Sequence, residues 1–500
     1  MFLIPIVSFA QEKGLDQRID EAFAPISNFF SKTVFFEIAG YPFVILLLIG
    51  SAVFFTVYFG FPNIRYFWTS INVVRGKYDD VEKSDSDSSD GEVSHFQALA
   101  TAVSGTVGNG NIAGVALAIA LGGPGATFWM IICGLIGMSS KFVECTLGVQ
   151  YRDVGDDGTI YGGPMYYLTK GLKEKGFKTL GKVAAVFFAI FCIGGSFGGG
   201  NAAQSNQATI VLKQLLGLES TSSGAIIGLI MAILVGIIII GGIKRIASVT
   251  EKIVPFMALL YLIACLYILL VNFSLVDDAI ALIIKEAFNP TAMGVGGFIG
   301  VLMVGFKRAA FSNEAGVGSA SIAHSAVKTK YSASEGLVAL LEPFIDTVVI
   351  CTMTALVIII FNFGGAFEYG GDGMGIVLID GVPYEGAGIT SKAFAEYIPY
   401  SGVFLTIAVV LFAVSTMISW SYYGLQSWKY LFGRGRIADL TYKLIFCMFV
   451  VIGSAASMSS IWDFSDAMIF AMVFPNMIGL FFLFPVVKEQ LNKYLEAIKS

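Results

Sequence analysis

The chain has 500 residues, of which 56% are hydrophobic and only 13% are charged, and its formal net charge is -5. A soluble globular protein carries about 25% charged residues, so this composition excludes a water-soluble fold, and the negative charge excludes a nucleic-acid binder. The apolar runs are long and continuous rather than alternating, which indicates an all-α polytopic membrane protein and not a β-barrel. The six cysteines lie within apolar runs and the two histidines in separate polar stretches, so neither a zinc site nor a redox dithiol is predicted.

The first 95 residues are predicted to hold one transmembrane helix with a flank on each side. Residues 1–10 are either a signal peptide cut after Ala10 or a short apolar lead-in to an amphipathic segment that lies on the outer face up to residue 40. Residues 41–60 form an extra N-terminal transmembrane helix. Residues 61–95 form a cytoplasmic linker, whose acidic and serine-rich part at 79–94 should be solvated and flexible.

Eleven runs in all are apolar enough to cross a bilayer, which takes ~20 residues of helix. They lie near residues 41–60, 96–120, 126–149, 184–212, 224–241, 253–271, 291–318, 334–361, 401–424, 441–457 and 465–484. Lysine and arginine are concentrated in the loops on one side, so the positive-inside rule places the N-terminus outside and the tail at 485–500 in the cytoplasm. The chain is thus expected to be a multi-pass protein of the plasma (inner) membrane, with an irregular, glycine-rich external loop at 362–398.

One predicted span contains residues that a regular helix tolerates poorly. Gly105, Gly108 and Gly110 fall within six residues, next to serine, threonine and two asparagines. Each glycine costs about 1 kcal/mol relative to alanine in a helix interior. Backbone groups freed inside a bilayer must be satisfied within the protein. The segment 104–111 therefore predicts an interrupted helix that faces a polar cavity.

A second span, at 305–318, combines glycines with Lys307, Arg308 and Glu314, which cannot face lipid at low cost. The glycines that precede it, from Gly294 to Gly300, can equally serve close helix packing. We expect this span to be interrupted as well.

The two interrupted spans open two blocks of five spans, at 96–271 and 291–484, whose loops alternate in side so that the blocks have opposite orientation. Interrupted helices at matching positions of inverted repeats are typical of the binding site of a secondary transporter. The half-helix after the first interruption offers amides, which suit a carboxylate, from Asn109, Gly110 and Asn111. The half-helix before it offers carbonyl oxygens, which suit Na⁺, such as those of Ser104 and Val107.

Five stretches of this chain resemble the alanine or glycine:cation symporter family: GTVGNGNIAGVALAIALGGPGATFWM, GGPMYYL, NEAGVGSASIAHSAVKT, EPFIDT and STMISWSYYG. The resemblance covers about residues 20–485. It implies a leucine-transporter-type fold of two inverted five-helix repeats, preceded here by one extra N-terminal helix. It also implies import of alanine or glycine, driven by Na⁺ or sometimes by H⁺.

The resemblance further implies a set of substrate contacts, namely Asn109, Gly110, Asn111, Gln204, Phe306, Thr416 and Trp420. Thr416 and Trp420 are four residues apart and so share one helix face. Thr416 would hydrogen-bond the substrate, while Trp420 would cap the pocket and leave room for little more than a methyl group. The alternative for Trp420 is a tryptophan at the membrane interface.

The implied sodium ligands are the main-chain oxygens of Ser104, Val107 and Phe412 and the hydroxyls of Ser415 and Thr416. The alternative for the two hydroxyls is a bond to the preceding helical turn. Among other polar residues, Lys141 and Glu144 are expected to pair, and Glu342 and Asp346 to act near the cytoplasmic mouth or in ion coupling. Asn313 and Glu314 are expected to satisfy backbone groups where the second interrupted helix resumes.

Four hypotheses for the function follow. The leading one is a sodium-coupled importer of alanine and glycine that works by alternating access as a monomer in the lipid bilayer. An H⁺-coupled symporter of the same fold, in which Glu314 or Asp346 titrates, stays open. A channel is disfavoured because no filter-like ring is present, and an intramembrane enzyme because HExxH does not occur and the acidic pairs have no obvious nucleophile or metal partner.

Overall fold

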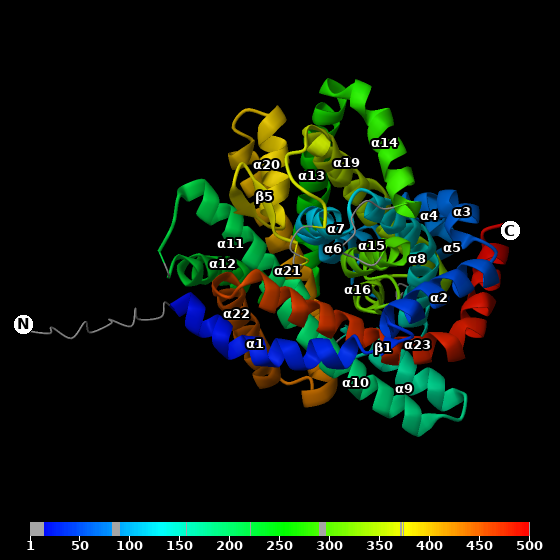
Figure 1. Cartoon of the computed structure of the whole chain (residues 1–500). Helices are drawn as coiled ribbons and strands as arrows, with labels where there is room; N and C mark the ends of the chain where they lie inside the picture. The colour runs from blue at the N-terminus through cyan, green and yellow to red at the C-terminus, as the bar shows by residue number, and fades with distance from the viewer. Residues whose placement is uncertain are drawn as a thin grey trace, which may run out of the picture.

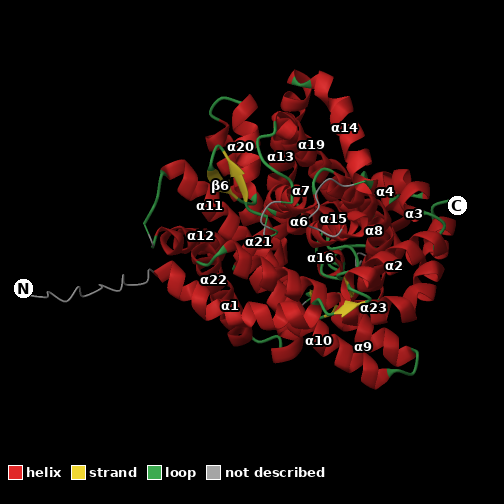
Figure 2. Ribbon diagram, in the orientation of Figure 1, coloured by secondary structure: helices red, strands yellow, loops and turns green. Residues whose placement is uncertain are grey.

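The computed structural model describes residues 15–82, 91–156, 158–220, 222–289, 297–370, 373 and 375–499. The predicted signal peptide at 1–10, Gly294 and Gly296, and the central part of the acidic linker lie outside the described residues. The described chain is almost entirely helical (Figure 2). Its strands form three short antiparallel hairpins: β1 (Glu37–Ile38) with β2 (Tyr41–Pro42), β3 (Asp153–Val154) with β4 (Ile160–Tyr161), and β5 (Val377–Ile379) with β6 (Val382–Tyr384).

The helices before the second interrupted span, in chain order, are α1 (Leu15–Val34), α2 (Phe43–Tyr58), α3 (Pro62–Arg65), α4 (Phe67–Val74), α5 (Asp79–Glu82), α6 (His95–Thr106), η1 (Gly110–Gly114), α7 (Val115–Gly122), α8 (Gly125–Gln150), α9 (Pro164–Glu174), α10 (Lys178–Phe197), η2 (Gly198–Ala202), α11 (Ala203–Leu216), α12 (Ser223–Ile239), α13 (Gly242–Val271) and α14 (Phe273–Phe288). Those that follow are α15 (Gly297–Asn313), α16 (Ala320–His324), α17 (Ser332–Ala339), α18 (Leu341–Pro343), η4 (Phe344–Cys351), α19 (Thr352–Phe361), η5 (Asn362–Gly364), α20 (Ala387–Tyr397), α21 (Ser401–Phe432), α22 (Arg436–Ala455) and α23 (Met458–Ala497).

Among the described residues, each of the eleven predicted runs overlaps one helix or several consecutive helices. In the described part of the chain, seven helices are long and apolar enough to cross a membrane, or eight when the bent pair α6–α7 is counted as one span. The apolar helices α2 and α12 have 16 and 17 residues and are shorter than a full span. The total of eleven spans therefore stays a prediction.

The amphipathic helix α1 lies along α23, which comes from the other end of the chain (Figure 1). The Ser27 hydroxyl donates a 2.8 Å hydrogen bond to the Ser460 carbonyl, and the rings of Phe23 and Phe464 meet edge to face at 5.0 Å. Contacts of both kinds hold α1 on the bundle.

The first interrupted helix is present as predicted. A capping box formed by Ser94 and Gln97 starts α6, which ends at Thr106. The chain resumes helical structure at Gly110, and the two halves are bent by 50°. The half that follows begins with a π-helical turn, η1.

The second interruption lies later than predicted. Helix α15 continues through Lys307 and Arg308 to Asn313, and the break falls where Glu314 adopts a left-handed φ of 54°. The two cations do not break the helix because Asp466 of α23 pairs with both; Lys307 Nζ lies 2.8 Å from Asp466 Oδ2. The prediction of irregular structure is therefore wrong for 305–313 and right from Glu314 onward.

Two polar segments are more ordered than the sequence suggested. The Glu82 side chain is buried, and the strand-like stretch around Val93 is fixed by a 2.8 Å bond from the Lys328 amide to the Val93 carbonyl. The prediction of a solvated linker is wrong for these two residues. The external segment 362–398 was expected to be irregular but contains the hairpin β5–β6 and helix α20, whose Thr390 hydroxyl donates to the Ile112 carbonyl at 3.1 Å.

Candidate functional site

Gln204 of α11 supports the break in the first interrupted helix. The Asn109 amide donates to Gln204 Oε1 at 3.0 Å, and Asn109 Nδ2 donates to the Gln204 carbonyl at 3.1 Å. Gln204 Nε2 in turn donates to the Gly199 carbonyl of η2 at 2.9 Å. Gln204 thus faces the break, as the resemblance implied, and ties it to the π-helical turn between α10 and α11.

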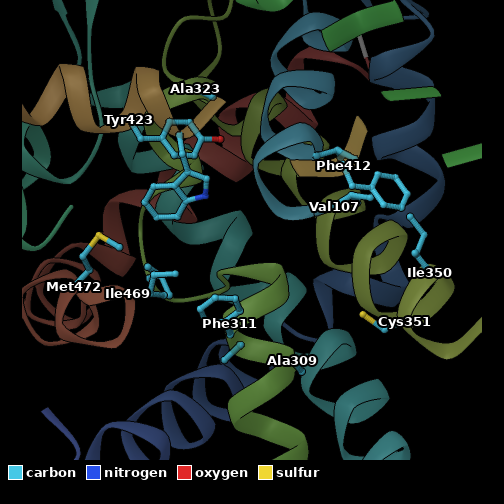
Figure 3. Packing of buried hydrophobic residues seen from close by; sticks show 14 of the residues in the cluster. Val107, Ala309, Phe311, Ala323, Ile350, Cys351, Phe412, Tyr423, Ile469 and Met472 are labelled. Carbon is cyan, nitrogen blue, oxygen red and sulfur yellow. The ribbon is translucent and has the colours of Figure 1, made fainter. Parts of the chain in front are cut away.

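A small cavity lies against this break. It is lined by Gly105, Thr106, Gly110, Gly199, Gln204, Phe311, Ser312, Glu314, Trp420 and Ile469. Its volume is about 10 Å³, which is close to the space that one water molecule needs. An amino acid can enter only if the lining side chains move apart. Phe311 and Ile469 are drawn on one side of the hydrophobic packing around this region, and Val107 and Phe412 on the other (Figure 3).

Trp420 is the largest side chain in the cavity wall. Its indole Nε1 donates to Glu314 Oε1 at 2.9 Å, and its ring meets that of Tyr423 at 5.4 Å. The ring lies against Gly200, where a methyl group would overlap it. Because Trp420 is only 1% exposed and contacts a buried carboxylate, the alternative of an interfacial tryptophan does not hold.

Phe306 is not brought to the cavity. Its ring lies 6.4 Å from that of Trp129 on α8, and the cavity is instead lined by Phe311, five residues later on α15. Five residues correspond to a rotation of about 140° around a helix of 3.6 residues per turn, so the two rings point to different sides. Ser312 also lines the cavity, and no local pattern in the sequence singles out either residue.

Asn111 is directed away from the cavity. Its Nδ2 donates to Asp346 Oδ1 at 2.6 Å, and its Oδ1 accepts from the Gly108 amide at 2.8 Å. Its own amide donates to the Gly108 carbonyl at 3.1 Å and is not free. Asp346, which lies in η4, also accepts from the hydroxyls of Ser312 at 2.9 Å and Thr347 at 2.7 Å. The Asn111 side chain therefore fastens the break to η4, and the three donors satisfy a buried carboxylate.

The predicted sodium ligands gather where α6 ends against α21. The Ser104 hydroxyl donates to the Ser415 carbonyl at 2.8 Å. The Ser415 hydroxyl donates to the Phe412 carbonyl at 3.0 Å, which is the alternative bond within its own helix. A methyl group at Gly108 would overlap Thr416 Oγ1, so the Thr416 side chain touches the break directly.

Two buried oxygen atoms at the break lack partners. Among the described residues, neither Thr416 Oγ1 nor Asn109 Oδ1 has a hydrogen bond. A buried polar atom without a partner is costly and uncommon in folded proteins. Both are hard, neutral oxygen donors, and an alkali cation is bound by such donors without a full charge nearby. The unpartnered oxygens of Thr416 and Asn109 are therefore suitable ligands for Na⁺.

Asn313 and Glu314 differ in role. Asn313 Oδ1 accepts from the Ala315 amide at 3.0 Å and so satisfies backbone at the second break, as predicted. The Glu314 carboxylate instead accepts from the hydroxyl of Ser319 and from Trp420. Glu314 is thus a cavity residue that joins the second break to α21.

A chain of buried ionisable side chains lies apart from the cavity: Glu82, His95, Glu335, His324, Glu342, Lys141 and Glu144. Both histidines bond the same carboxylate, since Glu335 accepts from Nδ1 of His95 and, at 2.5 Å, from Nδ1 of His324. Lys141 Nζ is 3.1 Å from Glu342 and 3.8 Å from Glu144. A cavity of about 550 Å³ opens beside the Glu82 end of this chain. Lys141 and Glu144 are thus paired, as predicted, but within a larger group that the sequence did not reveal.

The comparisons with known proteins identify the family. The model described as the sodium:alanine symporter family matches residues 26–500. The chain belongs to the sodium:alanine symporter family. It is 40% identical to the sodium/alanine symporter AgcS of Methanococcus maripaludis, over 92% of this chain and 95% of that one. It is 33% identical to the probable sodium/glutamine symporter GlnT of Bacillus subtilis, over 91% of this chain and 88% of that one.

Among solved structures, the crystal structure of MhsT in complex with L-phenylalanine has a TM-score of 0.51 with this symporter at 14% identity. The similarity covers 80% of this chain and 99% of that one. It shows the fold alone, and this is the leucine-transporter-type fold predicted from the sequence. The chain is therefore a multi-pass membrane transporter that couples amino-acid transport to sodium, and not an enzyme.

Proposed function

We propose that this symporter imports alanine and glycine together with Na⁺, across the plasma (inner) membrane, by alternating access. The N-terminus would lie outside and the C-terminus in the cytoplasm. One observation carries the proposal: the two sides of the break, at Thr106 and Gly110, and the Trp420 ring line one buried cavity, while the unpartnered Thr416 hydroxyl lies against Gly108 within the break. We also propose that it functions as a monomer.

The cation and the amino acid are proposed to bind on either side of the same break. Na⁺ would take the oxygens of Thr416, Asn109 and Val107, while the amino-acid carboxylate would take the amide of Gly110, which lines the cavity. Binding of the first ligand would order the backbone of the break between Thr106 and Gly110, and the second ligand binds to the same segment. By linkage, the amino acid must then tighten Na⁺ binding by the same factor.

The experiment that tests coupling is alanine binding across a series of Na⁺ concentrations at constant ionic strength. We expect the affinity for alanine to rise with Na⁺ by roughly 5–150-fold, the usual range for coupled sites. Thr416→Val keeps the shape of the side chain but removes the hydroxyl, so it should flatten this dependence. Thr406→Val, a buried threonine elsewhere on α21, is the matched control and should keep it. If the affinity of the wild-type chain for alanine does not change with Na⁺ concentration, the proposal is contradicted.

Preference for small side chains is proposed to come from Trp420. Trp420→Ala should strengthen inhibition of alanine uptake by leucine and glutamine by about tenfold or more, because it adds room for several methylene groups. Trp428→Ala is the control on the same helix, since Trp428 packs against Phe432 with ring centroids 4.3 Å apart and does not line the cavity. The measurement is competition for labelled alanine uptake into proteoliposomes. Unaltered selectivity in Trp420→Ala would show that another group limits substrate size.

Proton coupling remains the second candidate because the cavity wall holds a buried carboxylate, Glu314, and Asp346 contacts the break through Asn111. It predicts uptake that persists without Na⁺, follows a pH gradient and is lost in Glu314→Gln or Asp346→Asn. The sodium proposal predicts that uptake stops when Na⁺ is replaced by choline at any pH gradient.

A further inference from the structure

A further cavity, much larger than the central one, lies beside the first turns of α23. Its volume is about 580 Å³, and its polar lining includes Lys307, Arg308, Glu385, Asp463 and Asp466. In the proposed orientation it opens to the outside, because it borders the segment that carries hairpin β5–β6. We call it the outer vestibule.

The charged groups of the outer vestibule leave two buried atoms without partners. Lys307 Nζ and Arg308 Nη2 both bind the same oxygen, Oδ2 of Asp466. Among the described residues, Arg308 Nη1 and Asp466 Oδ1 have no hydrogen-bond partner. The Arg308 side chain is 5% exposed and that of Asp466 is 2% exposed, so water does not freely solvate either atom. Within the described chain, the Arg308–Asp466 ion pair therefore has one free donor, Arg308 Nη1, and one free acceptor, Asp466 Oδ1.

Two aromatic rings stand between the outer vestibule and the central cavity. Trp462 lines the vestibule and Phe311 lines the central cavity. Their ring centroids are 4.9 Å apart, and the Arg308 guanidinium lies 5.3 Å from the Trp462 ring and 5.6 Å from the Phe311 ring. A ligand bound to Arg308 would thus lie close to the Trp462 and Phe311 rings, which separate the outer vestibule from the central cavity and Trp420.

We propose that the outer vestibule is a second binding site for an amino-acid zwitterion. Arg308 Nη1 donates to the carboxylate, and Asp466 Oδ1 accepts from the ammonium group. In an α-amino acid one carbon separates these two groups, which matches a donor and an acceptor on adjacent side chains. The vestibule carries both signs of charge, which disfavours a simple anion or cation relative to a molecule that bears both. This inference rests on the proposed function, since it takes the vestibule ligand to be the transported substrate.

The test counts alanine molecules per chain. Equilibrium dialysis of the purified wild-type symporter at saturating Na⁺ is expected to give two bound alanine molecules, of which one is held more weakly. Arg308→Lys keeps a positive charge for Asp466 but removes the free guanidinium nitrogen. It should weaken one site by about tenfold or more and reduce the count to one over the same range of alanine. Thr416→Val, which changes the side chain that lies against Gly108 in the first break, should affect the other site.

A second measurement needs only the wild-type chain. Glycine should displace alanine from the weaker site, whereas acetate and methylammonium, which each carry one of the two charges, should not. Displacement by either ion alone would overturn the assignment of a zwitterion site.

The two proposals fail in different ways. One sodium-dependent alanine per wild-type chain, with no change in Arg308→Lys, would overturn the vestibule site and leave the proposed function intact. Absence of sodium-dependent binding in the wild-type chain would overturn the proposed function; a remaining sodium-independent site that Arg308→Lys abolishes would still support the vestibule.

Discussion

Gly108→Ala is expected to lower the affinity for alanine and Na⁺ by about tenfold or more. The added methyl group would overlap Thr416 Oγ1 and lie 3.0 Å from Gln204 Oε1, which accepts the Asn109 amide. Inserting a methyl group into a packed site costs about 1–3 kcal/mol, and each 1.4 kcal/mol corresponds to a factor of about ten in affinity. Relief of the overlap moves Thr416 or Gln204 out of the site. The measurement is alanine binding to purified protein at several Na⁺ concentrations.

Gly114→Ala is the matched control for this substitution. Gly114 lies on the same interrupted helix, and a methyl group there would meet only the Trp462 ring, at 3.8 Å. This is an ordinary van der Waals contact, so binding should change little. Wild-type affinities in a folded Gly108→Ala protein would show that Thr416 and Gln204 do not shape the site.

Glu335→Gln should destabilise the symporter by about 3–5 kcal/mol, as removal of one partner from a buried ion pair does. The Glu335 carboxylate is fully buried and bonds both histidines. His95 also donates from Nε2 to Glu82 at 2.6 Å, and an imidazole that donates from both nitrogens is a cation. Loss of the central carboxylate leaves this cation with one partner. The measurement is thermal inactivation of alanine binding in detergent, whose midpoint should fall.

The control for Glu335→Gln is Glu489→Gln. Glu489 pairs with Lys493 on the surface of α23 at 2.6 Å, with side-chain exposures of 61% and 55%. Solvent screens such a pair, so the midpoint should stay where it is in the wild-type chain. If both variants inactivate at the same temperature, Glu335 does not hold the two histidines in a stabilising cluster.

The parts of the site that the sequence predicted are those with a local cause. The break after Thr106 was predicted from residues 104–111 alone, where three glycines stand beside serine, threonine and two asparagines. The family resemblance predicted Gln204 and Trp420 as site residues, and both side chains line the cavity. The resemblance also predicted that Ser104 and Ser415 lie in one site, and the Ser104 hydroxyl donates to the Ser415 carbonyl.

The parts that were missed depend on distant partners or on helix rotation. Helix α15 stays intact at Arg308 because Asp466, 158 residues away, neutralises it, and no local pattern shows that. Phe306 and Phe311 are both phenylalanines of one helix, and only the packing of α15 decides which of them turns inward. His95 and His324 meet at Glu335 although the sequence places them far apart.

The central cavity measures about 10 Å³, whereas the cavity beside Glu82 and His95 and the outer vestibule measure about 550 and 580 Å³. If the proposed alternating access passes through this form, the central cavity carries across no more than about one water molecule, so movement of solvent with the substrate is small.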